Sequence, residues 1–176
     1  MAQRTIEVIT EAFDHHNIKY RVVDVENLSF VDAGYNITGG PTVRFHFLSQ
    51  SEQNDVQVRV NGILHKVGKE KKSRILEACN RINSEMRFYK FYLDKEGNVF
   101  GQADLPAGTP EEQVGENCYE LFVRGLQILD RCYHYFPEAY YATPETEKNE
   151  LLLNTLNALQ DLRDNPVTLP PEEDKN

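Results

Sequence analysis

Residues 87–136 constrain the fold of this 176-residue chain more than any other part of it. They begin with an aromatic segment, RFYKFYLDKEGNVFGQADLP, and continue into VGENCYELFVRGLQILDRCYHYFP. The first segment has two runs of strand-forming residues on either side of a turn at residues 94–98, and the second repeats apolar residues at helical spacing. A hairpin followed by a long amphipathic helix predicts an antiparallel sheet packed against helices.

The aromatic hairpin has two unlike faces if Leu93 pairs with Val99. That register places Phe91 over Gly101 on a face suited to the core. The other face carries three aromatic residues among polar ones, which is more apolar surface than solvent exposure requires. Either helices of the same protomer or a second subunit cover this face, or it binds a partner protein. The partner-binding candidates are Phe88, Tyr92 and Phe100.

A second hairpin is predicted from residues 43–47 and 56–60, where apolar and polar residues alternate. Pairing Phe47 with Val56 gathers the apolar side chains on one face. The same register sets Arg44 opposite Arg59, a like-charge pair that destabilises the sheet slightly unless something neutralises it.

The remaining elements complete an α+β pattern. Helices are expected at residues 5–16 and 69–84, and the long helix is expected to stop at Pro137. A short β-branched run at residues 20–25 predicts a first strand. The element order is then α-β-β-β-α-β-β-α. The predicted fold class is α+β, with a twisted antiparallel sheet of about five strands packed against helices.

The last 40 residues differ in composition from the rest. Residues 137–176 hold nine acidic and three basic residues, so they carry two-thirds of the net charge of -9. They are expected to form an acidic appendage that consists of a linker (PEAYYATP), a leucine-rich helix at about residues 145–163 and a disordered tail. This helix either completes the protomer or its dimer, or lies against basic side chains, with the basic run at residues 66–74 as one option. The other candidate contacts are Arg44, Arg59, Leu152, Leu156 and Leu159.

Composition argues against several classes of protein. A hydrophobic content of 40% with 27% charged residues is typical of a folded globular protein, and the negative net charge disfavours nucleic acid as a partner. No apolar run reaches the length of a membrane span, and the first residues lack a secretory signal core. The expected location is therefore cytoplasmic, with no membrane partner. The three cysteines are expected to be buried free thiols.

No motif for catalysis or phosphate binding occurs in the sequence, and no catalytic residue, metal ligand or cofactor is expected. His15 and His16 are adjacent, and adjacent residues on a helix face different directions, so joint metal binding is not expected. A rival hypothesis is an enzyme or small-molecule sensor with a pocket between the sheet and the long helix. That pocket would use Asp104, Glu116 or Tyr119.

Three segments carry a resemblance to a known family. KKSRILEACNRIN (residues 71–83) is a helix that ends in two asparagines three apart, RFYKFYLD (87–94) and the strand end ADLP (103–106) follow, and VGE (114–116) opens the helix that reaches ILDRCY (128–133). These segments resemble the YbjN family, described as a "putative bacterial sensory transduction regulator", and the order of elements resembles the fold of type III secretion chaperones. The resemblance spans roughly residues 1–136. It implies frequent dimerisation, peptide or protein binding, and no catalytic residues.

The prediction for the whole chain has two parts. Residues 1–136 form a YbjN-like, chaperone-like α+β domain, and residues 137–176 form the acidic appendage. The expected function is that of a bacterial, non-enzymatic protein-binding or regulatory module, a homodimer that binds a segment of a partner protein.

Overall fold

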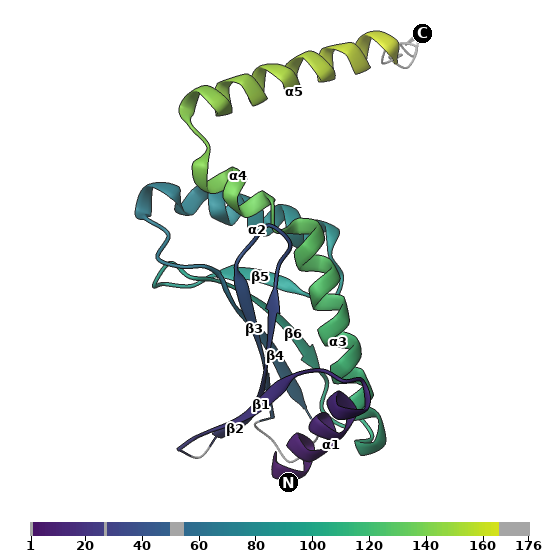
Figure 1. Cartoon of the computed structure of the whole chain (residues 1–176). Coiled ribbons are helices and arrows are strands. Elements are labelled where there is room, and N and C mark those ends of the chain that lie inside the picture. The colour runs from purple at the N-terminus through teal and green to yellow at the C-terminus, as the bar shows by residue number, and fades with distance from the viewer. Residues whose placement is uncertain (1, 27, 50–54, 166–176) are drawn as a thin grey trace, which may run out of the picture. The chain divides into compact units, whose positions relative to one another are not determined.

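A six-stranded antiparallel sheet in the order β1-β2-β3-β4-β6-β5 is the framework of the structure (Figure 1). The computed structural model describes residues 2–26, 28–49 and 55–165. Consecutive strands are neighbours except that β6 lies between β4 and β5. The strands are β1 (Tyr20–Val25), β2 (Leu28–Asn36), β3 (Thr42–Leu48), β4 (Val56–Leu64), β5 (Lys90–Leu93) and β6 (Val99–Leu105).

Helices cover one face of this sheet (Figure 1). α1 and α3 pack against each other, and α2 lies beside the edge strand β5. Lys69–Lys71 form a short 3-10 turn before α2. The helices are α1 (Ala2–His15), α2 (Lys72–Glu85), α3 (Glu111–Cys132), α4 (Tyr135–Tyr141) and α5 (Pro144–Asp164).

The core lies between the sheet and α1 and α3. Along β3 and β4 the residues alternate between buried and half-buried, because successive side chains point to opposite faces of a strand. Phe13 of α1 packs edge-on against Phe47 at 5.1 Å, and Phe122 of α3 packs edge-on against Phe45 at 5.0 Å. These four rings are at least 96% buried and join both helices to the centre of the sheet.

α1 and α3 approach each other closely at Gly115. A Cβ atom at this position would lie 2.5 Å from the carbonyl oxygen of Val8 and 2.9 Å from Cβ of Ala12. Only glycine permits this spacing, since any side chain would overlap the backbone of the neighbouring helix. The contact fixes the end of α1 against the first half of α3.

The aromatic hairpin has the predicted register. Leu93 pairs with Val99 and Phe91 pairs with Gly101. A Cβ atom on Gly101 would lie 3.2 Å from the Phe91 ring, so the ring covers the glycine as expected.

The predicted register of the second hairpin is wrong by two residues. Phe47 pairs with Val58 rather than Val56, and Arg59 lies opposite His46 rather than Arg44. A shift of two residues keeps every side chain on its predicted face, so the apolar pattern does not distinguish the two registers. The segment expected to join the strands includes residues 50–54, which lie outside the described residues.

The sheet has one strand more than the five or so predicted. The additional strand is β2, which contains Asp32, Gly34 and Asn36, residue types that are depleted in strands. Tertiary contacts outweigh this low propensity, because β2 pairs along its length with both β1 and β3.

The segment after α3 is helical rather than a linker. α3 ends at Cys132, and α4 follows with Pro137 as its third residue, where a helix tolerates proline because the first amides have no intrahelical partner. Lys71 Nζ lies 3.6 Å from the centre of the Tyr140 ring, and the Arg81 guanidinium lies 4.2 Å from that of Tyr135. These cation–π contacts hold α4 against α2 and the 3-10 turn that precedes it.

The chain divides into two compact units between Tyr140 and Tyr141. α5 belongs to the second unit, and its bounds agree with the helix predicted at residues 145–163. Thr143 caps its N-terminus in a reciprocal capping box with Thr146. The tail predicted to be disordered falls largely on residues 166–176, which lie outside the described part of the chain.

Candidate interaction surface

A continuous row of side chains crosses all six strands on the face opposite the core. Each member pairs directly with the next through the sheet register. We call it the cross-strand row, and we call the face that carries it the open face. The row consists of Arg21, Asp32, His46, Arg59, Gln102 and Lys90.

Asp32 is the most buried charged group of the row, with 1% of its surface exposed. Arg21 Nε donates to Asp32 Oδ2 at 2.7 Å, and Arg44 Nε donates to Oδ1 at 2.8 Å. Burial alone would raise the pKa of Asp32, but the hydrogen bonds from Arg44 and Arg21 outweigh burial and lower this pKa below 3.8. The carboxylate therefore stays ionised. It neutralises Arg44, for which the sequence analysis identified no counter-charge.

His46 lies beside this cluster, and burial is the main reason why its pKa is lowered. Its Nε2 lies 3.6 Å from Asp32 Oδ1, and its Nδ1 lies 3.2 Å from the Asn61 amide nitrogen. Burial lowers the pKa of His46 below 6.5, and the surrounding arginines lower it further, although Asp32 acts in the opposite direction. Protonating His46 therefore costs folding free energy.

The centre of the open face is an arginine on an aromatic stack. The guanidinium of Arg59 lies 4.1 Å from the centre of the Phe100 ring, and that ring stacks on its cross-strand neighbour Tyr92 at 5.4 Å. Tyr92 is 45% exposed. Arg59 Nε is buried and has no hydrogen-bond partner among the described residues. An N–H that is buried without a partner is costly, so this guanidinium is not fully satisfied by the protein's own acceptors.

The open face is basic, in contrast to the protein as a whole. Among the residues of the six strands, four cations lie on it, and two carboxylates, Asp32 and Asp104, oppose them, while the chain carries a net charge of -9. The cations are Arg21, Arg44, Arg59 and Lys90. Lys90 Nζ also donates to the carbonyl oxygen of Asn83 at 2.7 Å, which ties the end of the row to α2.

The structure brings together two of the three predicted partner-binding aromatics. Tyr92 and Phe100 stack on the open face. Phe88 precedes β5, is 48% exposed, and has the guanidinium of Arg124 in α3 at 4.7 Å from its ring centre. Phe88 therefore lies beside α3 rather than in the stack.

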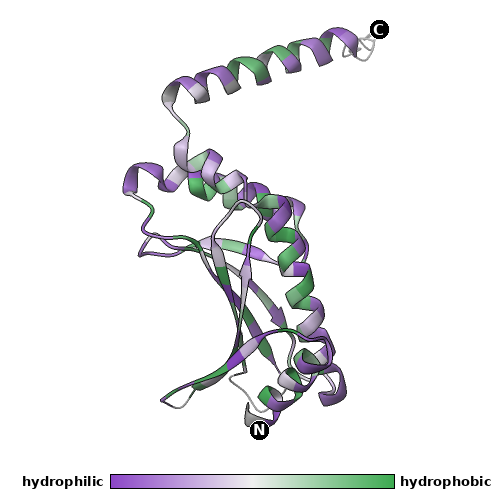
Figure 2. Cartoon of the chain, viewed as in Figure 1, coloured by the Kyte–Doolittle hydropathy of each residue, from purple (hydrophilic) through white to green (hydrophobic). Residues whose placement is uncertain are grey.

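The residues proposed to contact the appendage occupy two different units. Arg44 is engaged by Asp32, whereas Arg59 lies on Phe100. Six leucines of α5 are 54–68% exposed, and Figure 2 shows the hydrophobic stretch in the middle of that helix. These leucines are Leu151, Leu152, Leu153, Leu156, Leu159 and Leu162.

The residues suggested for a pocket between sheet and long helix do not line one site. Asp104 lies on the open face, where it accepts a hydrogen bond from Gln102 at 3.1 Å. Glu116 and Tyr119 lie on α3 and contact His16 instead. The core face between them is filled by the aromatic residues described above.

Sequence reasoning missed the cluster around Asp32 because it missed β2. The alternating polar residues Arg44, His46 and Arg59 did indicate one shared face. Only the additional strand shows that Asp32 is the carboxylate beside Arg44 and His46.

These features define an α+β protein in which helices cover one face of an antiparallel sheet and a basic, aromatic face remains partly exposed. Residues 5–138 match the family model YbjN, described as "Putative bacterial sensory transduction regulator", so the chain belongs to the YbjN family. The family predicted from the sequence is thus confirmed.

Two solved structures are similar to this chain at low identity. A chain in the crystal structure of the ExsC–ExsE complex has a TM-score of 0.46 and 16% identity, over 74% of this chain and 94% of that one. YbjN from E. coli has a TM-score of 0.44 and 12% identity, over 84% and 92%. No curated protein matches the chain. Within the described residues, no helix has the length and apolar character needed to cross a bilayer.

Proposed function

We propose that this protein is a non-enzymatic regulatory or chaperone-like module that binds an acidic segment of another protein on its open face. The observation that carries the proposal is Arg59, whose guanidinium lies on the Phe100–Tyr92 stack and whose Nε has no partner within the described part of the chain. An acidic side chain of the ligand would accept from Arg59, and an adjacent apolar side chain would cover Tyr92. The family description as a regulator is compatible with this role.

Charge complementarity favours an acidic ligand. The open face is locally basic on an otherwise acidic protein, so it attracts carboxylates while the remainder of the surface repels them. Charge-assisted hydrogen bonds to a guanidinium are stronger than neutral ones, and burying an aromatic ring adds about 1.5–3 kcal/mol. Together they provide a polar and an apolar anchor side by side.

Affinity capture from native bacterial lysate with an Arg59→Gln/Tyr92→Ser variant tests the proposal. Proteins retained by the wild type and identified by mass spectrometry should be lost from the variant, and their retention should decrease with added salt. Leu76→Ser is the matched control, since Leu76 is 47% exposed but lies on α2. The control should retain the same proteins.

Two results would contradict the proposal. If the same proteins bind the double variant and the wild type equally, the interface lies elsewhere. A variant that unfolds under capture conditions shows that Tyr92 and Arg59 form part of the core. A thermal-shift screen against metabolites tests the rival sensor hypothesis, because a small ligand that binds tightly raises Tm by mass action.

We also propose that α5 mediates homodimerisation. Its exposed leucines form a large apolar surface, and such surfaces mark interaction sites. A second copy of the chain provides an equal surface. The alternative occupant is the basic open face, which would attract the acidic residues of the same segment.

Full-length Leu152→Ser/Leu156→Ser/Leu159→Ser separates these alternatives. The triple variant should be monomeric by analytical ultracentrifugation, whereas Asn154→Ser/Asn157→Ser, on the same helix, should remain dimeric. A monomeric wild type refutes the dimer. A dimer that persists in the triple variant assigns the interface to other residues.

A further inference from the structure

We propose a binding site for a divalent transition-metal ion of the zinc class where the end of α1 meets α3. Its ligands are His15, His16 and Glu116. One ligand atom from each of the three side chains lies within 4.8 Å of the others. Two imidazole nitrogens and a carboxylate oxygen are a typical ligand set for zinc, and they leave a fourth position for water or another ligand.

The site exists because α1 ends between the two histidines. His15 is the last residue of the helix, His16 lies in the following turn, and Asn17 adopts a φ of 56°. The expectation that adjacent histidines face apart holds within a helix but fails at this end, where the chain changes direction. The two rings lie 4.8 Å apart in an edge-on arrangement.

The His16 ring is already oriented for coordination. It stacks flat on Tyr119 of α3, with 3.6 Å between ring centres and 1° between planes. Its Nε2 lies 2.9 Å and 3.2 Å from the two carboxylate oxygens of Glu116. Ligand atoms in a tetrahedral zinc site are about 3.3 Å apart, given bonds of about 2.0–2.1 Å. An ion therefore fits with small side-chain rotations.

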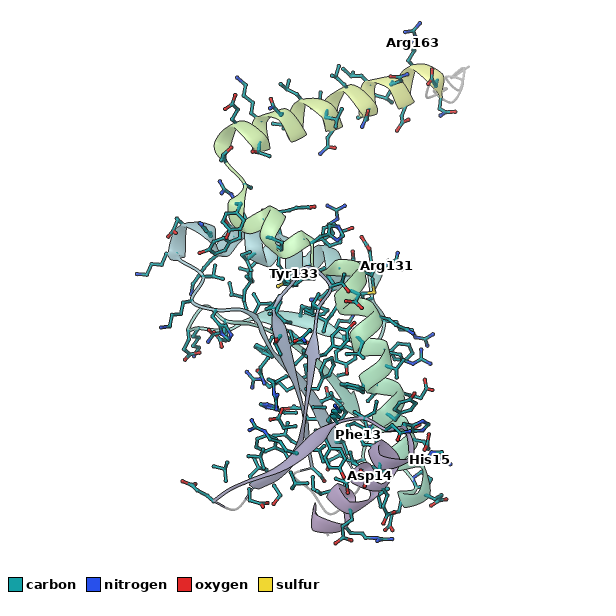
Figure 3. The ribbon with its side chains drawn as sticks, in the orientation of Figure 1. Phe13, Asp14, His15, Arg131, Tyr133 and Arg163 are labelled. Carbon is teal, nitrogen blue, oxygen red and sulfur yellow. The ribbon has the colours of Figure 1, made fainter. Side chains whose placement is uncertain are left out.

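His15 completes the set from the solvent side. Figure 3 shows it at the end of α1, next to the lower part of α3. Its side chain lines a groove between the two helices together with Glu11 and Glu112. Glu11 is one helical turn before His15, and Glu112 is one turn before Glu116, so either can supply a fourth ligand.

The charges in the groove also favour a cation. Four glutamates line it, and Arg4 is the one cation among its described lining residues. Arg4 donates to Glu111 at 2.9 Å, so it neutralises the glutamate that is not needed as a ligand. The glutamates are Glu11, Glu111, Glu112 and Glu116. The ion would bridge α1 and α3 near their tight contact at Gly115.

Isothermal titration of the full-length, untagged protein with zinc chloride tests the site. The wild type should bind one Zn²⁺, and His15→Ala or Glu116→Gln should weaken binding by more than about tenfold, because changes to groups that merely support ligands already cost about 10–100-fold. His65→Ala and Glu77→Gln, exposed residues of the same types, should leave the affinity unchanged. Substitution with Co²⁺ should give visible absorption bands of a tetrahedral nitrogen–oxygen site.

Several outcomes of these zinc titrations would overturn the proposal. No zinc binding by the wild type, or equal binding by His15→Ala/Glu116→Gln, overturns the proposal. Weakened binding in the His65→Ala control assigns the ion to another site and also overturns it. Circular dichroism of metal-free variants should match the wild type, since His15 and Glu116 are both exposed. A variant that is unfolded without metal would show these side chains to be structural, contrary to the proposal.

Discussion

Asn83 forms both outward-facing backbone hydrogen bonds of Phe91. Its Nδ2 donates to the Phe91 carbonyl oxygen at 2.9 Å, and its Oδ1 accepts from the Phe91 N–H at 2.7 Å. β5 is an edge strand, so these backbone groups would otherwise face solvent. A side chain of α2 thus takes the place of a seventh strand and blocks pairing with another chain.

Replacing Asn83 with alanine should destabilise the protein by about 1–3 kcal/mol, because two partly buried backbone groups lose their partners. Urea denaturation measures the change. Asn80→Ala is the control, since Asn80 is exposed one turn earlier in α2 and should have little effect. A stability equal to that of the control would show that water replaces the Asn83 amide without cost. Increased self-association of Asn83→Ala would show that the edge has been exposed.

Gly125→Ala should also be destabilising, although alanine is the better helix former. A Cβ atom at Gly125 would lie 2.5 Å from Phe45 Cε1 and 3.1 Å from Tyr89 Cζ. Overpacking costs about 1–3 kcal/mol, which exceeds the gain of about 1 kcal/mol in helix propensity. Thermal unfolding measures the difference against Gln127→Ala, an exposed site on the same helix. An increased Tm for Gly125→Ala would mean that the rings move aside without cost.

The protein should become less stable as the pH falls, because His46 binds a proton more weakly in the folded state than in the unfolded chain. Its pKa is lowered in the folded state, so the unfolded chain binds a proton first as the pH falls below about 6.5. The free energy of unfolding therefore decreases from that pH down to the folded pKa, and is unaffected by His46 above it. His46→Gln should remove this part of the pH dependence, and His134→Gln should retain it. Identical pH profiles for the wild type and His46→Gln would contradict the assignment.

Asp32→Asn should destabilise the sheet by about 1.5–3 kcal/mol, because hydrogen bonds from two arginines lose their charged acceptor. The arginines are partly exposed, so water offsets part of the loss. Asp32 contributes stability above its ordinary pKa of 3.8, and this contribution is lost as the pH falls through its lowered folded pKa. Chemical denaturation at neutral and acidic pH tests both points, and a variant as stable as the wild type at neutral pH contradicts the first.

Phe88 and Tyr92 should differ in their effect on partner capture. Tyr92→Ser should weaken capture because Tyr92 lies in the stack on the open face, whereas Phe88→Ser should have a smaller effect because its ring lies beside Arg124 of α3. Comparing the retained proteins for each single variant measures this. Equal losses would indicate one surface that extends around the edge of β5.

Much of the fold follows from local sequence patterns. Alternation of Val43, Phe45 and Phe47 specifies which face is buried, and helical spacing locates α1, α3 and α5. α3 nevertheless ends at Cys132 and not at Pro137 as expected. Register is harder to predict, since a shift of two residues preserves the faces, and only contacts between distant residues select the observed pairing.

The candidate sites were only partly predictable for the same reason. Tyr92 and Phe100 were found because one hairpin contains both. Asp32 lies on a strand of low propensity, and its arginines come from two other strands. The proposed zinc site requires His16 and Glu116, which are 100 residues apart in the chain, to meet where the end of α1 lies against α3.

The cross-strand row also sets the length of the partner segment that we propose for the open face. Neighbouring strands are about 4.8 Å apart, so the five intervals from Arg21 to Lys90 span about 24 Å. An extended chain advances about 3.4 Å per residue, and about seven residues cover that distance, of which alternate side chains face the sheet. A tripeptide would therefore contact only half of the row, and affinity should rise with peptide length until the sixth strand is reached.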